Sequence, residues 1–293
     1  MLCKKYLLLS LAVCLCSSLT VVAQQSKTPA PAGLTAAQIG EKNVAARGGL
    51  QAWRAVQTMS WTGKMDVGTG DSVERSRRQA ERKRERPIAI EVGENKDAAA
   101  KPGEAGKQVQ LPFVLEMKRP GKSRVEIEFA GKTAVQVYDG TNGWKVRPFL
   151  NRNDVQPFTP DEAKAQASNG ELDGPLVDYV AKGTKVELEG MEKVEGRDAY
   201  KLKLTTKAGN VRHVWIDAQN FLDVKLEGTP RRMDGRIRTV WVYQRDFRPV
   251  QGLMVPFTLE TAVDGYRETH KMVIEKVTVN PKLDDALFAK PKA

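Results

Sequence analysis

Apolar and polar residues alternate along most of this 293-residue chain, and that period of two constrains its fold more than any other feature. In the segment 124–129, Val125, Ile127 and Phe129 alternate with charged residues, and similar segments recur as far as Val279. Successive side chains of an extended strand point to opposite faces, so each segment has one apolar and one polar face. The pattern predicts a mainly β (α+β) protein whose antiparallel sheet is exposed to water on one side.

About eleven such segments follow one another between residues 59 and 279. Up-and-down connection of that many strands favours a single strongly curved antiparallel sheet or barrel. The clearest turn is at Asp139–Gly143, where Asp-Gly and Asn-Gly supply the positive φ angles that tight hairpins need. Trp144 follows this turn directly, so we expect it where the sheet meets its helical cover.

Short helices are expected to cover the sheet. Residues 34–59 carry apolar residues at helical spacing behind Thr35, a typical N-cap, and Gly48-Gly49 divides them into two pieces. Thr159-Pro160 begins a further helix, because proline suits the first helical position. A second short helix is predicted over residues 175–181, and a terminal helical turn over residues 284–290.

The N-terminus has the pattern of a secretory signal peptide over residues 1–23. Lys4-Lys5 precedes an apolar run, and small residues end it before Gln24. A membrane anchor is the alternative, but the run is short for a span of about 20 residues. Cys14 resembles a lipid-attachment cysteine, although Val13 before it fits poorly. We therefore expect export to the periplasm, a flexible linker over 24–33, and one domain over 34–293 that contains no cysteine.

Residues 69–108 lack the alternating pattern and read as a disordered insertion. The stretch 74–86 is rich in arginine, and the stretch 93–107 is rich in alanine, glycine and lysine. The arginine cluster is either a patch for acidic lipid or a solvated charged tip, and the solvated tip is favoured. The net charge of +11 permits peripheral contact with an anionic membrane surface, whereas nucleic acid is a weak partner for an exported chain.

No catalytic, metal or cofactor site is predicted. The chain has two histidines, His213 and His270, which lie far apart within strand patterns, and neither belongs to a cluster with metal-ligand spacing. The carboxylates mostly alternate with lysine and arginine on polar faces. A hidden carboxylate pair stays open as an alternative, but an enzyme is disfavoured.

Large apolar residues are abundant for a sheet with only short helices to cover it. Each one alone is more easily explained as part of an ordinary core, but together they favour an apolar groove suited to acyl chains. The candidate groove residues, chosen from the alternation, are Trp61, Met65, Phe113, Leu115, Ile127, Phe129, Trp144, Leu202, Trp215, Trp241, Tyr243 and Phe257.

Several segments resemble the LolA-like family of outer-membrane lipoprotein-sorting proteins. They are the strand entry 119–126 (RPGKSRVE), the hairpin 138–144 (YDGTNGW), the segments 172–179 and 190–202, and the closing 280–288 (NPKLDDALF). The resemblance covers about residues 38–291, apart from the basic insertion, which is not part of the family pattern. It implies an unclosed β-barrel of about eleven strands whose concave face holds the acyl chains of a lipoprotein.

The sequence and the resemblance together predict a monomeric periplasmic carrier for acyl chains of lipoproteins or another amphiphile. The alternative is an envelope interaction or sensor module that uses the same half-barrel to bind a protein partner without lipid transport. No binding residue of the family is transferred onto this chain, so the candidate groove residues rest on alternation alone.

Overall fold

The computed structural model describes residues 33–69, 108–148, 152–169, 171–233 and 235–292. The signal peptide expected at 1–23 lies outside these described residues. So do the linker expected at 24–33, except for residue 33, and the insertion expected at 69–108, except for its two end residues.

Two helices precede the sheet, as predicted. Helix α1 spans Ala36–Ala46, and Thr35 caps it with a capping box in which Gln38 reciprocates. Helix α2 spans Leu50–Ala55. Gly48 separates the helices because it has a φ of 112° and because a Cβ there would lie 2.3 Å from the Gly252 carbonyl oxygen.

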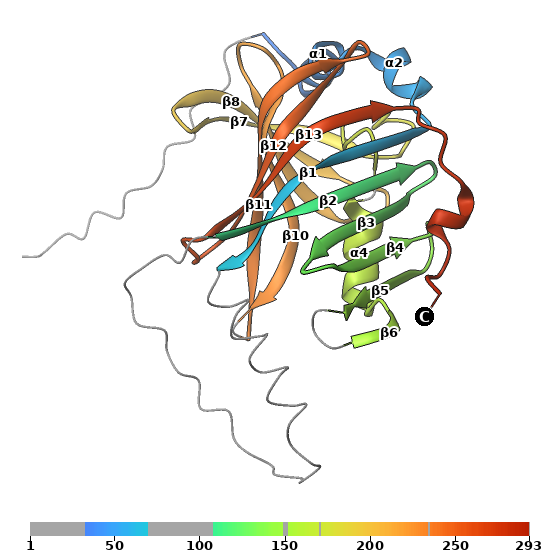
Figure 1. Cartoon of the computed structure of the whole chain (residues 1–293). Coiled ribbons are helices and arrows are strands. Elements are labelled where there is room, and N and C mark those ends of the chain that lie inside the picture. Colours follow the sequence, from blue (N-terminus) through green and yellow to red (C-terminus); the bar gives the residue numbers. More distant parts are fainter. Residues whose placement is uncertain (1–32, 70–107, 149–151, 170, 234, 293) are drawn as a thin grey trace, which may run out of the picture.

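The rest of the described chain is dominated by one antiparallel sheet of 13 strands (Figure 1). The strands are β1 (Thr58–Thr69), β2 (Gln108–Lys118), β3 (Lys122–Phe129), β4 (Lys132–Tyr138), β5 (Gly143–Arg147), β6 (Arg152–Pro157), β7 (Lys185–Val194), β8 (Arg197–Thr205), β9 (Val211–Asp217), β10 (Asp223–Met233), β11 (Arg236–Val250), β12 (Leu253–Val263) and β13 (Thr269–Val279).

The strands are ordered β6-β5-β4-β3-β2-β1-β13-β12-β11-β10-β9-β8-β7. Strands β6 and β7 are the two edges and do not pair with each other in the described chain, so the barrel is unclosed, as expected. The count exceeds the expected eleven, and β6 has no counterpart in the predicted set, because its residues (RNDVQP) lack an apolar face.

Helix α4 (Pro160–Asn169) shows how strongly the sheet curves. It hydrogen-bonds to β3, where the Gln166 side-chain amide donates to the Ser123 hydroxyl, and it also lies against β10. In a flat sheet these two strands, six strand spacings apart, would be separated by roughly 29 Å. One helix can touch both only because the sheet wraps around it, as Figure 1 shows.

The hairpin expected at Asp139–Gly143 is confirmed. The Asp139 carboxylate accepts hydrogen bonds from the backbone amides of Thr141 and Asn142, and Gly140 has a φ of 102°. Gly143 does not have a positive φ angle, so the turn conformation does not explain why a glycine stands at this position. The Phe158 ring occupies the place of a Cβ there, with its nearest carbon 1.9 Å away.

The helix expected over residues 175–181 is absent, and this stretch forms turns. Asp178 has a φ of +53°, which breaks a helix, and its carboxylate binds the Arg54 guanidinium with an Arg54 Nε to Asp178 Oδ2 distance of 2.9 Å. Leu176 and Val177 are buried instead. The terminal turn is confirmed as the 3₁₀ helix η2 (Asp285–Phe288).

Candidate functional site

The strand register divides the side chains of the sheet between two faces. Met59, Trp61 and Met65 of β1 pair with Met117, Leu115 and Leu111 of β2, and Leu115 pairs with Val125 of β3. Directly paired residues share a face. Ser123, two residues before Val125, binds α4, so this is the face that curves around the helix. We call it the inner face.

Eight of the twelve candidate groove residues lie on the inner face. Phe113, Phe257 and Ile274 form its buried cluster, with Trp61, Met65, Leu115 and Ile127 packed around them. Phe129 follows on the same face of β3. Leu202 is also inner, but it is fully buried in a second cluster beneath α1 and residues 172–177. Leu202, Phe113 and Phe257 therefore belong to the core beneath the surface.

A strip of apolar side chains on the inner face stays partly exposed in the described structure. We define the inner strip by six of these residues: Trp61, Met65, Leu115, Ile127, Leu259 and Met272. They come from five neighbouring strands, so the strip runs across the sheet rather than along one strand. Its side chains are apolar and pack against one buried cluster, a composition typical of ligand-binding grooves.

Trp61 adds one polar group to the inner strip. Its indole Nε1 is buried, and it has no hydrogen-bond partner among the described residues. A buried N–H without an acceptor costs free energy, on the order of 1–3 kcal/mol.

The other four candidates lie on the outer face. Trp144 pairs with Val137 on the face where η2 docks through the Lys122–Asp285 ion pair. Trp215 and Trp241 pack edge to face at a centroid distance of 5.5 Å, with Tyr243 beside them. The alternation identified apolar faces but could not say which one was concave.

Lys225 joins this outer cluster of Trp215, Trp241 and Tyr243. Its Nζ lies 4.3 Å from the Trp215 ring centroid and 4.0 Å from that of Trp241. Burial lowers the pKa of Lys225 below its ordinary value, while the Glu192 carboxylate opposes the shift. Glu192 also accepts the indole N–H of Trp215 at 2.9 Å. The outer cluster is therefore a packed aromatic surface with a cation inside it.

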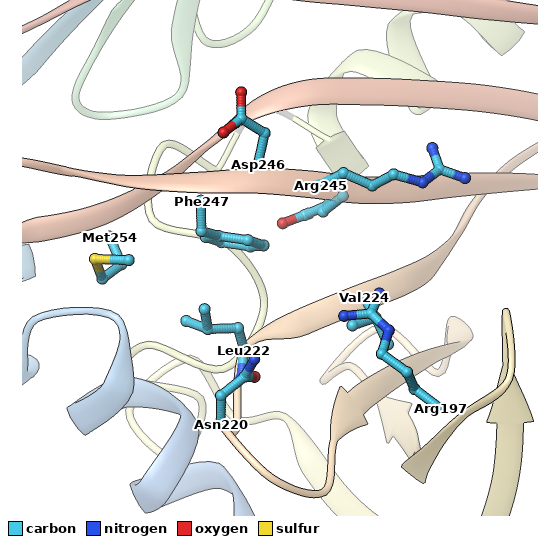
Figure 2. A pocket seen from close by; sticks show the side chains of 9 residues that line it. Arg197, Asn220, Leu222, Val224, Arg245, Asp246, Phe247 and Met254 are labelled. Carbon is cyan, nitrogen blue, oxygen red and sulfur yellow. The ribbon is translucent and has the colours of Figure 1, made fainter.

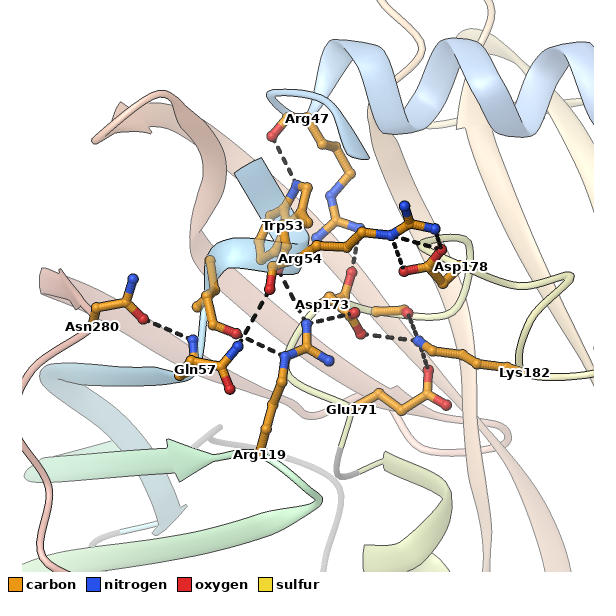
Figure 3. Close-up of polar contacts among 12 residues, drawn as sticks. Arg47, Trp53, Arg54, Gln57, Arg119, Glu171, Asp173, Asp178, Lys182 and Asn280 are labelled. Carbon is orange, nitrogen blue, oxygen red and sulfur yellow. Dashed lines mark hydrogen bonds and ion pairs between the residues drawn. The ribbon is translucent and has the colours of Figure 1, made fainter. Parts of the chain in front are cut away.

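A network of charged groups closes one end of the inner face (Figure 3). The Asp173 side chain is only 3% exposed and binds the Arg119 guanidinium at 2.7 Å and the Lys182 ammonium at 3.0 Å. The Arg47 guanidinium donates to the Asp173 carbonyl at 2.8 Å. These contacts tie the turn after β2 and the segment 171–182 to the end of α1. The sequence predicted a helix over residues 175–181 and gave no indication of this network.

Helix α4 is attached to the sheet mainly by polar contacts. The Lys145 ammonium, 10% exposed, binds the Glu162 carboxylate at 2.6 Å, and Glu162 also accepts the Thr159 backbone amide. Burial would raise the pKa of Glu162, but the hydrogen bonds from Lys145 and Thr159 lower it overall. Among the helical residues whose side chains are described, none is fully buried. Helix α4 therefore lies in the hollow of the half-barrel without a tightly packed apolar contact to the sheet.

A separate pocket of about 330 Å³ opens where β10 and β11 diverge (Figure 2). The pairs between these strands run from Lys225–Tyr243 to Met233–Arg236, and β11 continues beyond Tyr243 to Val250 paired with β12 only. The cations at the pocket already have partners, since Arg245 binds Glu195 and Glu260 and Arg197 binds Asp217. We assign no ligand to it. Its lining is Arg197, Asn220, Leu222, Val224, Gln244, Arg245, Asp246, Phe247 and Met254.

No group of three or more histidine, cysteine, aspartate or glutamate side chains among the described residues could hold a metal ion. No helix among those residues is both long and apolar enough to cross a bilayer.

The geometry defines an unclosed antiparallel half-barrel with a helix in its hollow and an apolar inner strip. This is a LolA-like fold. A LolA superfamily protein from Nitrosomonas europaea is 15% identical, with a TM-score of 0.52 over 88% of this chain and 99% of its own. A DUF1329 family protein from Desulfovibrio piger is 14% identical, with a TM-score of 0.53 over 87% and 98%.

A third similar structure is a domain assigned to the outer-membrane lipoprotein-sorting proteins, from Vibrio parahaemolyticus. It is 12% identical, with a TM-score of 0.51 over 87% of this chain and 96% of its own. At these identities the likeness concerns the fold. No family model matches the sequence, and no curated protein matches it.

Proposed function

We propose that this protein is a periplasmic carrier that shields the acyl chains of a lipoprotein, or of a related amphiphile, on its inner face. The observation that carries the proposal is the inner strip, whose apolar side chains pack against one buried cluster and stay partly exposed inside a half-barrel. The similar structure from Vibrio parahaemolyticus, with its assignment to lipoprotein sorting, supports the same class of ligand. The expected signal peptide supports the compartment.

Burial would supply most of the binding free energy. An acyl chain that covers apolar surface gains about 25 cal/mol per Å² and needs few directed contacts. The proposal gives the chain no catalytic step and no cofactor.

Uptake of a fluorescent fatty-acid probe tests the proposal, with two neighbouring residues of β2 as a matched pair. Leu115→Asn places a polar amide on the inner strip, and we expect it to weaken probe binding about tenfold, since it removes roughly 1.4 kcal/mol of apolar contact. Val114→Asn makes a comparable change on the outer face of the same strand, so binding should be unaffected. Equal effects of the two variants would contradict the inner site.

Native mass spectrometry of protein isolated from the periplasm tests the ligand class directly. A co-purifying acylated molecule is the expected result. If no lipid co-purifies and the unmodified protein takes up no probe, the proposed carrier function is wrong.

The basic insertion at 69–108 is a proposed contact with the anionic membrane surface. It carries the arginine cluster of residues 74–86, and charge attraction to anionic lipid rises with each basic side chain. Deleting residues 72–107 should weaken binding to anionic vesicles. If binding is unchanged after the deletion, the membrane contact is wrong and the segment is a solvated charged tip.

The outer cluster favours a second candidate function, an envelope protein-interaction or sensor module. Tryptophan and tyrosine are enriched at protein interfaces, and Trp241 and Tyr243 are half-buried on an open sheet face. Trp241→Ala should then abolish retention of one specific envelope protein while leaving probe uptake intact. If Trp241→Ala retains the same proteins as the unmodified chain, the outer cluster is structural.

A further inference from the structure

The hairpin between β10 and β11 combines exposed arginines with an exposed apolar side chain. It lies at the end of the sheet opposite helices α1 and α2, at the bottom of the view in Figure 1. Arg231, Arg232 and Arg236 are exposed, and Ile237 is 69% exposed. Met233, which pairs with Arg236, is partly exposed. We call the described residues 231–233 and 235–238 the basic hairpin.

The arginines of the basic hairpin are arranged so that they repel one another. Arg231 and Arg238 are direct cross-strand partners, and like charges in this position destabilise a hairpin. Among the described residues, Arg231, Arg232 and Arg236 form no ion pair, and the Arg232 guanidinium donates a hydrogen bond to the Gly235 carbonyl oxygen at 3.3 Å. The Arg238 Nε is buried without a hydrogen-bond partner in the described chain. A bound anion would relieve the repulsion between the exposed arginines.

The neighbouring turn does not cancel this charge. Arg238 stacks over Tyr266 of the β12–β13 turn, with 5.8 Å from its guanidinium carbon to the ring centroid. That turn contributes Arg267 together with Asp264 and Glu268. In the sequence of this hairpin and this turn, residues 231–238 and 264–268, there are five arginines and three acids, one of which is Asp234. The end as a whole stays positively charged.

The apolar side chain decides which kind of anion fits. A soluble anion would gain no binding free energy from contact with the apolar Ile237 side chain, which pairs with Arg232 near the tip of the hairpin. A protein partner needs a buried apolar core within an interface of about 1,200 Å² or more, and one exposed isoleucine is too little for that. A bilayer surface needs only shallow entry of one or two apolar side chains with cations at the level of the phosphates.

We propose that the basic hairpin is a docking element for an anionic lipid bilayer. Ile237 and Met233 enter the interface between head groups and acyl chains, while Arg231, Arg232 and Arg236 bind the lipid phosphates. Arginine suits this role because its planar guanidinium forms paired hydrogen bonds with phosphate oxygens. The proposal is independent of the carrier function, since the hairpin contributes no residue to the inner strip.

Flotation of the full chain with vesicles tests the docking element. The vesicles are phosphatidylcholine with and without phosphatidylglycerol. Each basic side chain near an anionic surface contributes about fivefold to partitioning, so replacing Arg231, Arg232 and Arg236 together by glutamine should weaken it roughly a hundredfold. Ile237→Ser, which changes no charge, should weaken it about tenfold.

The matched control replaces Lys64, Lys185 and Lys193 by glutamine. It removes the same charge from exposed positions, with side chains 53%, 70% and 68% exposed, outside the hairpin. We expect a much smaller loss, and none of the variants should change the uptake of a fatty-acid probe. Thermal unfolding confirms that each variant is folded. Probe uptake tests the carrier function and flotation tests the docking element. The failure of one proposal can therefore be distinguished from the failure of the other.

Three results would overturn the docking element. The first is a loss in the control as large as in the arginine variant, which would reduce the effect to net charge. The second is unchanged flotation in the arginine variant or in Ile237→Ser. The third is calorimetric binding of inorganic phosphate that the arginine variant abolishes, which would make the hairpin a site for a free anion.

Discussion

Asp173 is the residue on which the closed end of the half-barrel depends. Its carboxylate is buried, and it holds two cations that come from segments about 60 residues apart in the chain, Arg119 and Lys182. A buried carboxylate is stable only when its lone pairs are satisfied, and here both oxygens have partners. Removing the charge therefore affects more than one contact.

We expect Asp173→Asn to lower the free energy of unfolding by about 2–3 kcal/mol, because it leaves two cations without their anion. The value lies below that of a fully buried pair, since Arg119 and Lys182 are 29% and 25% exposed. Urea-induced unfolding measures it. Asp198→Asn, which breaks an exposed pair with Lys193, serves as the control and should cost under about 1 kcal/mol. Similar losses in both variants would mean that burial of Asp173 adds nothing.

Glu162 should make the attachment of α4 depend on pH. Its pKa is lower in the folded chain than its ordinary value of 4.5, because the bonds from Lys145 and Thr159 outweigh the effect of burial. Between the two pKa values the unfolded chain binds more protons, so stability falls as the pH falls through that window. The contribution is complete above pH 4.5 and disappears in more acidic solution.

Comparing unmodified protein with Glu162→Gln tests this directly. We expect the variant to be about 1 kcal/mol less stable at pH 7, the upper range for a partly exposed pair. The difference should shrink as the pH is lowered below 4.5. A difference that stays constant from neutral to acidic pH would show that the ionised carboxylate is not what holds the helix.

At the scale of single elements, a bulge in β13, where Glu275 is the extra residue opposite Thr62 and Gly63 of β1, fixes how the two halves of the sheet meet. The register between β1 and β13 shifts between Thr62 and Gly63. A Cβ on Gly63 would lie 2.0 Å from the Val273 carbonyl oxygen, which is backbone and cannot move aside. Gly63 is therefore required by close approach of two strands, not by its φ angle.

Two glycine-to-alanine changes separate this effect from the general properties of glycine. Gly63→Ala should destabilise the protein by about 2–4 kcal/mol, because the strands must separate. Gly40→Ala in α1 places its Cβ 3.6 Å from the Tyr179 ring, an ordinary contact, and should be neutral or stabilise by up to about 1 kcal/mol. Thermal unfolding of both variants gives the comparison. Destabilisation by Gly40→Ala would point to crowding beneath α1.

At the scale of the whole molecule, a ligand in the hollow should stabilise the fold. A ligand that binds only the folded chain contributes about 2.7 kcal/mol at one hundred times its Kd. For a chain of this size, that raises the midpoint of thermal unfolding by roughly 5–10 °C. Scans with and without a diacylated lipopeptide measure the shift. Leu115→Asn should reduce it and Val114→Asn should not; a shift of equal size in all three proteins would place the ligand elsewhere.

Local patterns were enough for most elements of this fold. Alternation predicted the strands, Thr35 and Gly48-Gly49 marked the two N-terminal helices, and Asp139–Gly143 marked a hairpin. Each of these signals acts over a few residues. The prediction failed over residues 175–181, where local propensity indicated a helix but the contact of Asp178 with Arg54, far away in the chain, favours turns.

The sequence by itself determined that this protein is a curved, one-sided antiparallel sheet with short helices, because backbone geometry turns a period of two directly into two faces. Only the tertiary structure decided which face is concave. That is why Trp144, Trp215, Trp241 and Tyr243 lie on the outer face although their apolar character matches that of Trp61 and Leu115. Curvature arises from pairing between strands and from a helix held by Lys145 and Ser123, and no short segment of sequence contains both partners.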